Sequence, residues 1–286
     1  QRSNSCLRMK RLFVFGCSYT SWNWPTYADI YAQQFDHYEN WGHAGLGNRA
    51  IAERVAECHA TNEFDKDDTV IVQWSSHLRY DYLNFKHTEP WQTKGSIFSY
   101  QNKEVFDDKW IETFYDEKAL FLHTMNNIIL TKGLLKDTNC KFHFTSISNL
   151  ETLGTDIPHQ KGHGENLRNT PELADAFKEF NLEQYRYVLE GPEWLESLGL
   201  HAWNRPDSSW WFEGNGEKWL ELHPSPVQHL SFCQSYLSHN LSEQTQKMID
   251  TVIDCKTNDY KETIKNITNL QLANWDRSYR GIKDAK

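Results

Sequence analysis

A serine stands near the start of the chain, where an α/β protein would place a nucleophile. Residues 11–15 (RLFVF) are typical of a buried strand, and they are followed by Gly16-Cys17-Ser18-Tyr19-Thr20. Open α/β sheets bind ligands at the carboxyl ends of their strands, and a serine in a tight turn there presents its hydroxyl clear of the sheet. Backbone N–H groups of such a turn can face a developing oxyanion. The alternative is that Ser18 only caps the next helix.

A histidine with a nearby carboxylate lies in the last third of the chain. The segment reads Leu220-Glu221-Leu222-His223-Pro224-Ser225-Pro226-Val227-Gln228. The capping-box spacing of Ser225 and Gln228 predicts a helix that begins here. His223 would then lie in a short loop, where its imidazole can take a proton from Ser18 while Glu221 orients the ring. The alternative for a lone His-Pro is a turn residue.

Other residues could support thiol, metal or nucleotide chemistry, but the sequence favours these functions less than a serine nucleophile. Cys17 would be the nucleophile if the turn favoured its thiolate, but cysteine is also a common small core residue. There are 13 histidines, yet no HExxH motif and no Cys/His set with zinc-finger spacing, and His229 is expected to pack inside a helix. The glycines at 42, 45 and 47 match neither a dinucleotide fingerprint nor a P-loop. We therefore expect no metal and no cofactor.

Strand and helix signals alternate through the first half of the chain. Apolar and β-branched runs predict strands at 11–15, 35–41, 69–74 and 141–145, and helical spacing predicts helices at 50–60 and 120–135. This order predicts an α/β fold with three layers, α/β/α, around a central parallel sheet with right-handed crossovers.

Two aromatic-rich insertions, at about 83–116 and 150–219, interrupt this alternation and are expected to form lids or small subdomains. Helices are predicted at about 226–238, 242–254 and 259–272. We expect one α/β domain over 9–240 and a C-terminal helical extension over 241–286 that packs on it.

Composition excludes several classes of partner. The 286 residues include 30 Lys+Arg and 39 Asp+Glu, and the net charge of -9 disfavours binding to nucleic acid or to an anionic membrane surface. No apolar run reaches the ~18–20 residues that cross a bilayer. The 6 cysteines are widely spaced, which is typical of free thiols in a reducing compartment. With no apolar leader and Met9 as the expected natural start, we predict a cytoplasmic protein.

Taken in order, these segments resemble the SGNH (GDSL-like) hydrolase superfamily. The family's first block, G-D-S-x-T, is Gly16-Cys17-Ser18-Tyr19-Thr20 here, with Cys in place of Asp. The second block, an Asn followed by the oxyanion glycine, is Asn40-Trp41-Gly42-His43-Ala44-Gly45. The last block, a His-Pro preceded by an acid, is His223-Pro224 with Glu221, although the family usually places Asp at the position of Leu220.

The resemblance implies a role for each matching residue and meets one departure. Ser18 would be the nucleophile, His223 the base and Glu221 its partner, with the N–H groups of Ser18 and Gly45 in the oxyanion hole. The family ends its third strand in G-x-N, but here the segment is Gln73-Trp74-Ser75-Ser76-His77. Ser76 or His77 would therefore have to replace the Asn donor, whose loss typically costs about 10²–10³ in rate.

The implied function is a serine hydrolase that cleaves a small ester, such as an O-acetyl group on a carbohydrate. Trp203, Trp210 and Trp211 are candidates for stacking on a sugar ring, with core packing as the alternative. Arg79 is a candidate for an anionic substrate group, with a structural ion pair as the alternative. Two other functions stay open, an O-acyltransferase and a non-catalytic module that binds a glycan or a protein.

Overall fold

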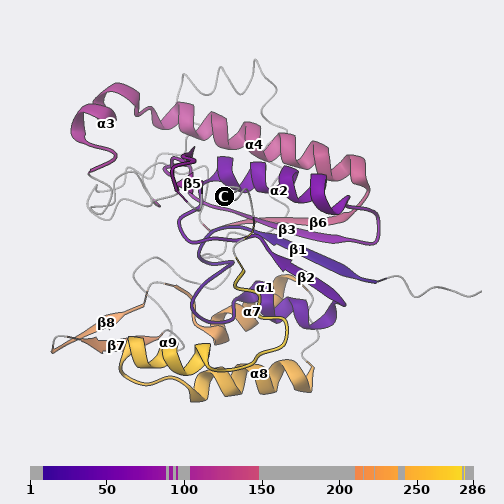
Figure 1. Ribbon diagram of the computed structural model, residues 1–286, viewed down its shortest axis with the longest axis vertical. Coiled ribbons are helices and arrows are strands. Elements are labelled where there is room, and N and C mark those ends of the chain that lie inside the picture. Colours follow the sequence, from indigo (N-terminus) through magenta and orange to yellow (C-terminus); the bar gives the residue numbers. More distant parts are fainter. Residues whose placement is uncertain are drawn as a thin grey trace, which may run out of the picture.

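The computed structural model describes residues 9–87, 90–92, 95, 104–147, 210–214, 216–221, 223–237, 242–278 and 280. Four strands form a parallel sheet in the order β2-β1-β3-β6 (Figure 1). They are β1 (Arg11–Phe15), β2 (His37–Asn40), β3 (Thr69–Trp74) and β6 (Lys141–Ser146). All four lie within two residues of the predicted strands, and the predicted parallel pairing is confirmed. Their carboxyl ends therefore meet at one edge of the sheet.

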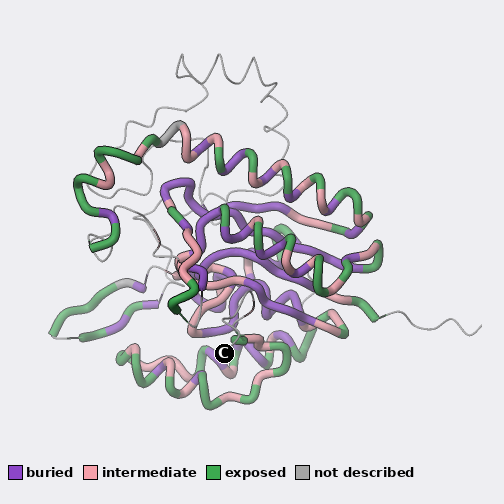
Figure 2. The backbone as a smooth tube through the Cα atoms, turned by 45° about the horizontal axis from the view of Figure 1, so that its top comes forward, coloured by how far each residue is buried: buried purple, intermediate pink, exposed green. Residues whose placement is uncertain are grey.

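Helices cover both faces of this sheet (Figure 1). On one face lie α2 (Asn48–Asn62) and α4 (Glu117–Thr138); on the other lie α1 (Tyr27–Tyr31), which continues into a 3₁₀ turn (Ala32–Gln34), and α7 (Pro226–Tyr236). Figure 2 shows the strands almost wholly buried between these layers. The predicted α/β sheet flanked by helices is thus confirmed.

The end of the chain packs on the α1 and α7 side (Figure 1). There lie α8 (Glu243–Asp254), α9 (Tyr260–Thr268) and a hairpin of β7 (Trp211–Gly214) and β8 (Glu217–Leu220). The segment after α9 returns to the sheet, where Asp276 Oδ2 accepts the N–H of Asn40 at 3.1 Å and Arg280 pairs with Glu39 at 3.4 Å. The first contact gives a partner to one backbone N–H of the edge strand β2, and the second fixes the returning segment to a side chain of the same strand.

The first insertion contributes short elements, whereas most of the second lies outside the described residues. Within 83–116 are β5 (Trp91–Gln92), paired with β4 (Tyr82–Leu83), and α3 (Asp108–Phe114). Asp107 caps α3 by accepting the N–H of Trp110 at 2.7 Å. Within the described ranges, no helix is long and apolar enough to span a membrane.

Candidate active site

The turn after β1 holds Ser18 beside the carboxyl edge of the sheet. The carbonyl of Cys17 accepts the N–H groups of Thr20 at 3.0 Å and Ser21 at 3.1 Å, which closes the turn. Ser18 lies inside it, 7% exposed. The next helix, α1, is capped by Thr26 through a capping box, so the alternative that Ser18 caps it is wrong.

Close packing explains the glycine that precedes this turn. A Cβ atom on Gly16 would lie 2.1 Å from Oγ1 of Thr20, a contact that no side chain tolerates. That hydroxyl is buried, and it lies 3.2 Å from both Oε1 of Gln73 and the hydroxyl of Tyr27. The serine turn is therefore tied to β3 on one side and to α1 on the other.

The turn after β2 is bonded directly to the serine turn. Asn40 donates from Nδ2 to the carbonyl of Thr20 at 2.9 Å and accepts the N–H of Gly42 on Oδ1 at 2.9 Å. The N–H of His43 donates to the carbonyl of Gly16 at 3.1 Å. Gly45, the predicted oxyanion residue, has φ of 84°, a backbone conformation that favours glycine. The structure thus brings the turns of Ser18 and Gly45 side by side.

The turn after β3 is held by Asn48, which the sequence did not single out. Asn48 accepts the N–H of Ser75 on Oδ1 at 2.7 Å and donates from Nδ2 to the carbonyl of Ser75 at 2.8 Å. Ser76 accepts the N–H of Leu78 on its hydroxyl at 3.2 Å, and the ring of His77 meets Phe121 edge-on at 6.1 Å. Both candidate donors are therefore buried and already in contact with the protein.

His223 and Glu221 form a close pair. Nδ1 of His223 lies 2.6 Å from Oε1 of Glu221, and the backbone N–H of His223 donates to the same oxygen at 3.1 Å. Glu221 is 6% exposed, so water competes little for its carboxylate. Because Nδ1 is engaged, Nε2 on the opposite side of the ring is the nitrogen that can act as a base.

Aromatic residues of the serine loop hold this imidazole. The ring of Trp22 stacks on His223 with centroids 3.4 Å apart and an interplanar angle of 19°, and Tyr19 meets it edge-on at 5.8 Å. Nε1 of Trp24 donates to the carbonyl of Pro224 at 2.9 Å. All three belong to the loop that carries Ser18, so two segments far apart in sequence converge here. The close spacing of these three aromatic residues directly after Ser18 is the sequence feature from which their role could have been predicted.

Burial separates the remaining reactive groups from this site. Cys17 is 0% exposed within the hydrophobic core, so substrate cannot reach its thiol and the Cys17 nucleophile is disfavoured. His229 lies in α7, also 0% exposed, and burial lowers its pKa to about 3 with a smaller contribution from His223. This agrees with the expected packing of His229. In the described part of the chain, no group of three or more His, Cys, Asp or Glu side chains is placed to hold a metal.

The three tryptophans predicted to bind substrate differ in their surroundings. Trp210 is 5% exposed and packs on Trp24 at 4.8 Å, so it lies in the core, which is the alternative that the sequence left open. Trp211 is 43% exposed, with the ammonium of Lys218 5.5 Å from its ring. Trp203 lies outside the described residues.

Arg79 lines a polar cavity of about 370 Å³ between the first turns of α2 and α4. Neither Ser18 nor His223 is among the lining residues. Asp81, also in its wall, accepts the N–H groups of Gly47 at 2.8 Å and Ala50 at 3.0 Å, and burial raises its pKa to about 6. The carboxylate thereby occupies the N-terminus of α2.

Comparison with known proteins adds no identity to this geometry: no family model matches the chain, and no curated protein matches it.

Proposed function

We propose that this protein is a serine hydrolase of the SGNH type that cleaves a small ester, such as an O-acetyl group on a carbohydrate. The observation that carries the proposal is the His223–Glu221 pair, bonded at 2.6 Å and stacked on the loop that presents Ser18. The parallel strand order and the bonded turns of Ser18 and Gly45 support it, because a nucleophile and an oxyanion donor must share one edge of the sheet.

The proposed reaction follows the logic of a catalytic triad. Ser18 Oγ attacks the acyl carbonyl while Nε2 of His223 takes its proton, and Glu221 stabilises the imidazolium that forms. The N–H groups of Ser18 and Gly45 hold the oxyanion. His223 then gives the proton to the leaving alcohol, and the acyl group stays on Ser18. A water molecule, deprotonated by His223, attacks this acyl-enzyme and releases the acid.

The position of the acid, two residues before the histidine, is compatible with this role. Glu221 has one methylene more than Asp, and its Oε1 accepts from both the backbone and Nδ1 of His223. This double contact fixes the ring in one tautomer, which is the function of the acid in a triad.

Labelling with a fluorophosphonate probe tests the proposal directly. We expect a covalent adduct on Ser18 in the parent protein and in Cys17→Ala, and none in Ser18→Ala. The Cys17→Ala variant is the matched control, because it changes the neighbouring nucleophile and leaves the serine in place. Circular dichroism must show that all three proteins are folded. Folded parent protein without an adduct on Ser18 would overturn the proposal.

The turn after β3 favours a second candidate, a non-catalytic binding module on the same scaffold. The Ser76 hydroxyl accepts a backbone N–H and His77 packs against Phe121, so neither is plainly aimed at an oxyanion. In that case acetyl esters such as p-nitrophenyl acetate are not turned over, and Ser18→Ala binds ligand as well as the parent. An O-acyltransferase would instead be labelled on Ser18 and would pass its acyl group to a sugar hydroxyl faster than to water.

A further inference from the structure

The cavity between α2 and α4 has the composition of a ligand site. Its volume of about 370 Å³ is at the small end of the range of roughly 300–1,000 Å³ usual for small-molecule sites, which suits a group the size of one sugar ring. We propose that it binds a sugar unit that carries a carboxylate. That this sugar also bears the cleaved ester rests on the proposed function; its binding does not.

Arg79 supplies the cationic contact for the carboxylate. Its Nη1 donates to the carbonyl of Leu46 at 3.0 Å, and among the described residues it forms no ion pair within 4 Å. Its charge still acts on Asp81 in the same wall: burial raises the pKa of that carboxyl, and Arg79 partly offsets the rise. Arg49, the other arginine of the cavity wall, is already bonded through Nε to Glu53 at 2.8 Å. A guanidinium that keeps donors available in a cavity is suited to an anionic planar group, because its remaining N–H groups match two carboxylate oxygens.

Acceptors in the same wall select against a phosphate. The carboxylate of Glu53 lines the cavity beside the Asp81 carboxylate, so a ligand must also offer hydrogen-bond donors. At neutral pH inorganic phosphate carries more negative charge than one carboxylate, so both acids repel it more strongly, and it offers fewer hydroxyl donors than a sugar. Sugar hydroxyls donate as well as accept, and the side chains of Asn127 and His123 on α4 face them with further polar atoms.

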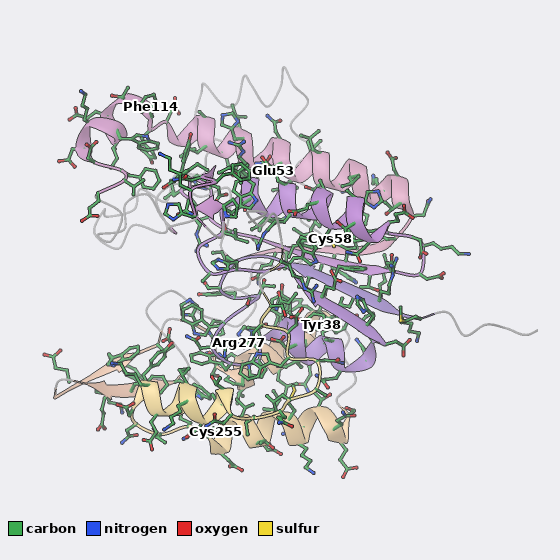
Figure 3. All side chains as sticks on the ribbon, viewed as in Figure 1. Tyr38, Glu53, Cys58, Phe114, Cys255 and Arg277 are labelled. Atoms are coloured by element: carbon green, nitrogen blue, oxygen red, sulfur yellow. The ribbon has the colours of Figure 1, made fainter. Side chains whose placement is uncertain are left out.

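An aromatic surface adjoins the cavity, as carbohydrate sites commonly require. Tyr80 lines the cavity, is 40% exposed, and meets Trp110 edge-on at 5.2 Å. Trp110 lies 5.7 Å from Phe114, which is 66% exposed at the end of α3. Figure 3 shows Phe114 and the cavity residue Glu53 on the same side of the sheet. Exposed ring faces next to polar groups allow stacking on the apolar face of a sugar.

The cavity adjoins the proposed catalytic turns. The carbonyl that Arg79 contacts belongs to Leu46, the residue after Gly45. Asn48, in the cavity wall, holds the turn after β3 through both backbone groups of Ser75. The cavity wall is therefore bonded to the segment that follows the predicted oxyanion glycine, although Ser18 and Gly45 do not line the cavity themselves.

Isothermal titration calorimetry on the 286-residue Ser18→Ala protein tests the binding without turnover. At constant ionic strength, we expect glucuronate to bind at least about ten-fold more tightly than glucose, and inorganic phosphate to bind no better than glucose. Arg79→Gln should weaken glucuronate binding at least about ten-fold, and Arg79→Lys should weaken it less because it keeps the charge. Arg277→Gln is the matched control and should stay within about three-fold, since it removes the same charge from an arginine that does not line the cavity.

Each outcome decides the proposal. Equal affinity for glucuronate and glucose, or equal loss in Arg79→Gln and Arg277→Gln with both variants folded, would overturn it. Tighter binding of phosphate than of glucuronate would also overturn it. Fluorophosphonate labelling separates this failure from that of the proposed function. Labelled Ser18 without glucuronate binding refutes only the cavity, whereas glucuronate binding without labelling refutes only the hydrolase.

Discussion

The turns after β1 and β2 differ from the turn after β3 in how their polar groups are used. In the first two, the buried Asn40 side chain bonds to the backbone carbonyl of Thr20 and the Thr20 hydroxyl bonds to Gln73, and Gly16 admits no side chain at all. The turn after β3 is equally well bonded through Asn48, but the residues beyond it open onto a polar cavity.

This difference separates positioning from recognition. The proposed catalysis would need groups held within a few tenths of an ångström, and His223 is stacked on Trp22 and bonded to Glu221. The proposed recognition would need donors that the protein itself does not consume, and Arg79 uses Nη1 for the carbonyl of Leu46 in the cavity wall. Substitutions in the first region should therefore act on rate, and substitutions around the cavity on binding or on stability.

The largest effect is expected at His223. His223→Ala removes the proposed base, and we expect kcat on an acetyl ester to fall about 10⁴- to 10⁶-fold with little change in KM. The ring is 21% exposed at the surface of its loop, so the fold should survive its loss. Steady-state kinetics with p-nitrophenyl acetate, beside a thermal melt, measure both. A fall of less than ten-fold would mean that this region does not perform the chemistry.

Glu221→Gln is the companion of this test. Gln keeps the size of Glu221 but removes the charge that stabilises the imidazolium, so kcat should fall about 10²- to 10⁴-fold, less than for His223→Ala. A merely structural Glu221 would lower the melting temperature and leave kcat of the folded enzyme unchanged.

Asn48 is the next largest, and its effect should appear as stability. Asn48→Ala leaves the buried N–H and carbonyl of Ser75 without their partners, and we expect a loss of about 2–4 kcal/mol in the free energy of unfolding. Urea denaturation measures it. Asn127→Ala, in the wall of the same cavity, should lose less than about 1 kcal/mol. Equal losses of stability in the two variants would show that the hydrogen bonds of Asn48 to Ser75 do not stabilise the turn.

Local sequence patterns predicted the strands of the sheet and the pairing of Glu221 with His223. The strand runs are contiguous, and Glu221 and His223 are two residues apart, so their pairing needs no tertiary information. Asn48 escaped notice because its partner Ser75 lies across the sheet edge. For Trp210 the choice between a sugar platform and core packing stayed open, because composition shows an aromatic ring but not what covers it. In the fold, Trp24 from the start of the chain covers it.

The buried imidazole of His229 in α7 should make the stability of the protein depend on pH. Its folded pKa of about 3 lies below the ordinary value of 6.5, so the unfolded chain binds the extra proton between these values. The resulting stabilisation is complete above pH 6.5 and falls as pH drops toward 3, by about 1.4 kcal/mol per unit. His229→Phe should therefore lose about 2 kcal/mol less than the parent between pH 6.5 and 5.

The buried carboxyl of Asp29 makes stability depend on pH in the opposite direction from His229. Its contribution must therefore be separated from that of His229. Burial raises the folded pKa of Asp29 to about 7, so its contribution is present at low pH and is lost as pH rises toward 7. This term is common to the parent and to His229→Phe and cancels in their difference. Identical acid-unfolding curves for the two proteins would contradict the assignment of His229 as a buried neutral side chain.

The smallest effect compares two glycines. A Cβ atom on Gly133, exposed in α4, would meet nothing within 4 Å, whereas one on Gly16 would meet Thr20 at 2.1 Å. Because alanine favours helix over glycine, Gly133→Ala should stabilise the protein by about 0.5–1 kcal/mol. Gly16→Ala, the same change in the packed turn, should destabilise it and lower the rate of Ser18 labelling. Chemical denaturation measures the stability of both variants, and probe labelling measures the reactivity of Ser18. If both changes were neutral, the turn that holds Ser18 would not be tightly packed. The contrast between this closely packed turn and the more open cavity between α2 and α4 would then be wrong.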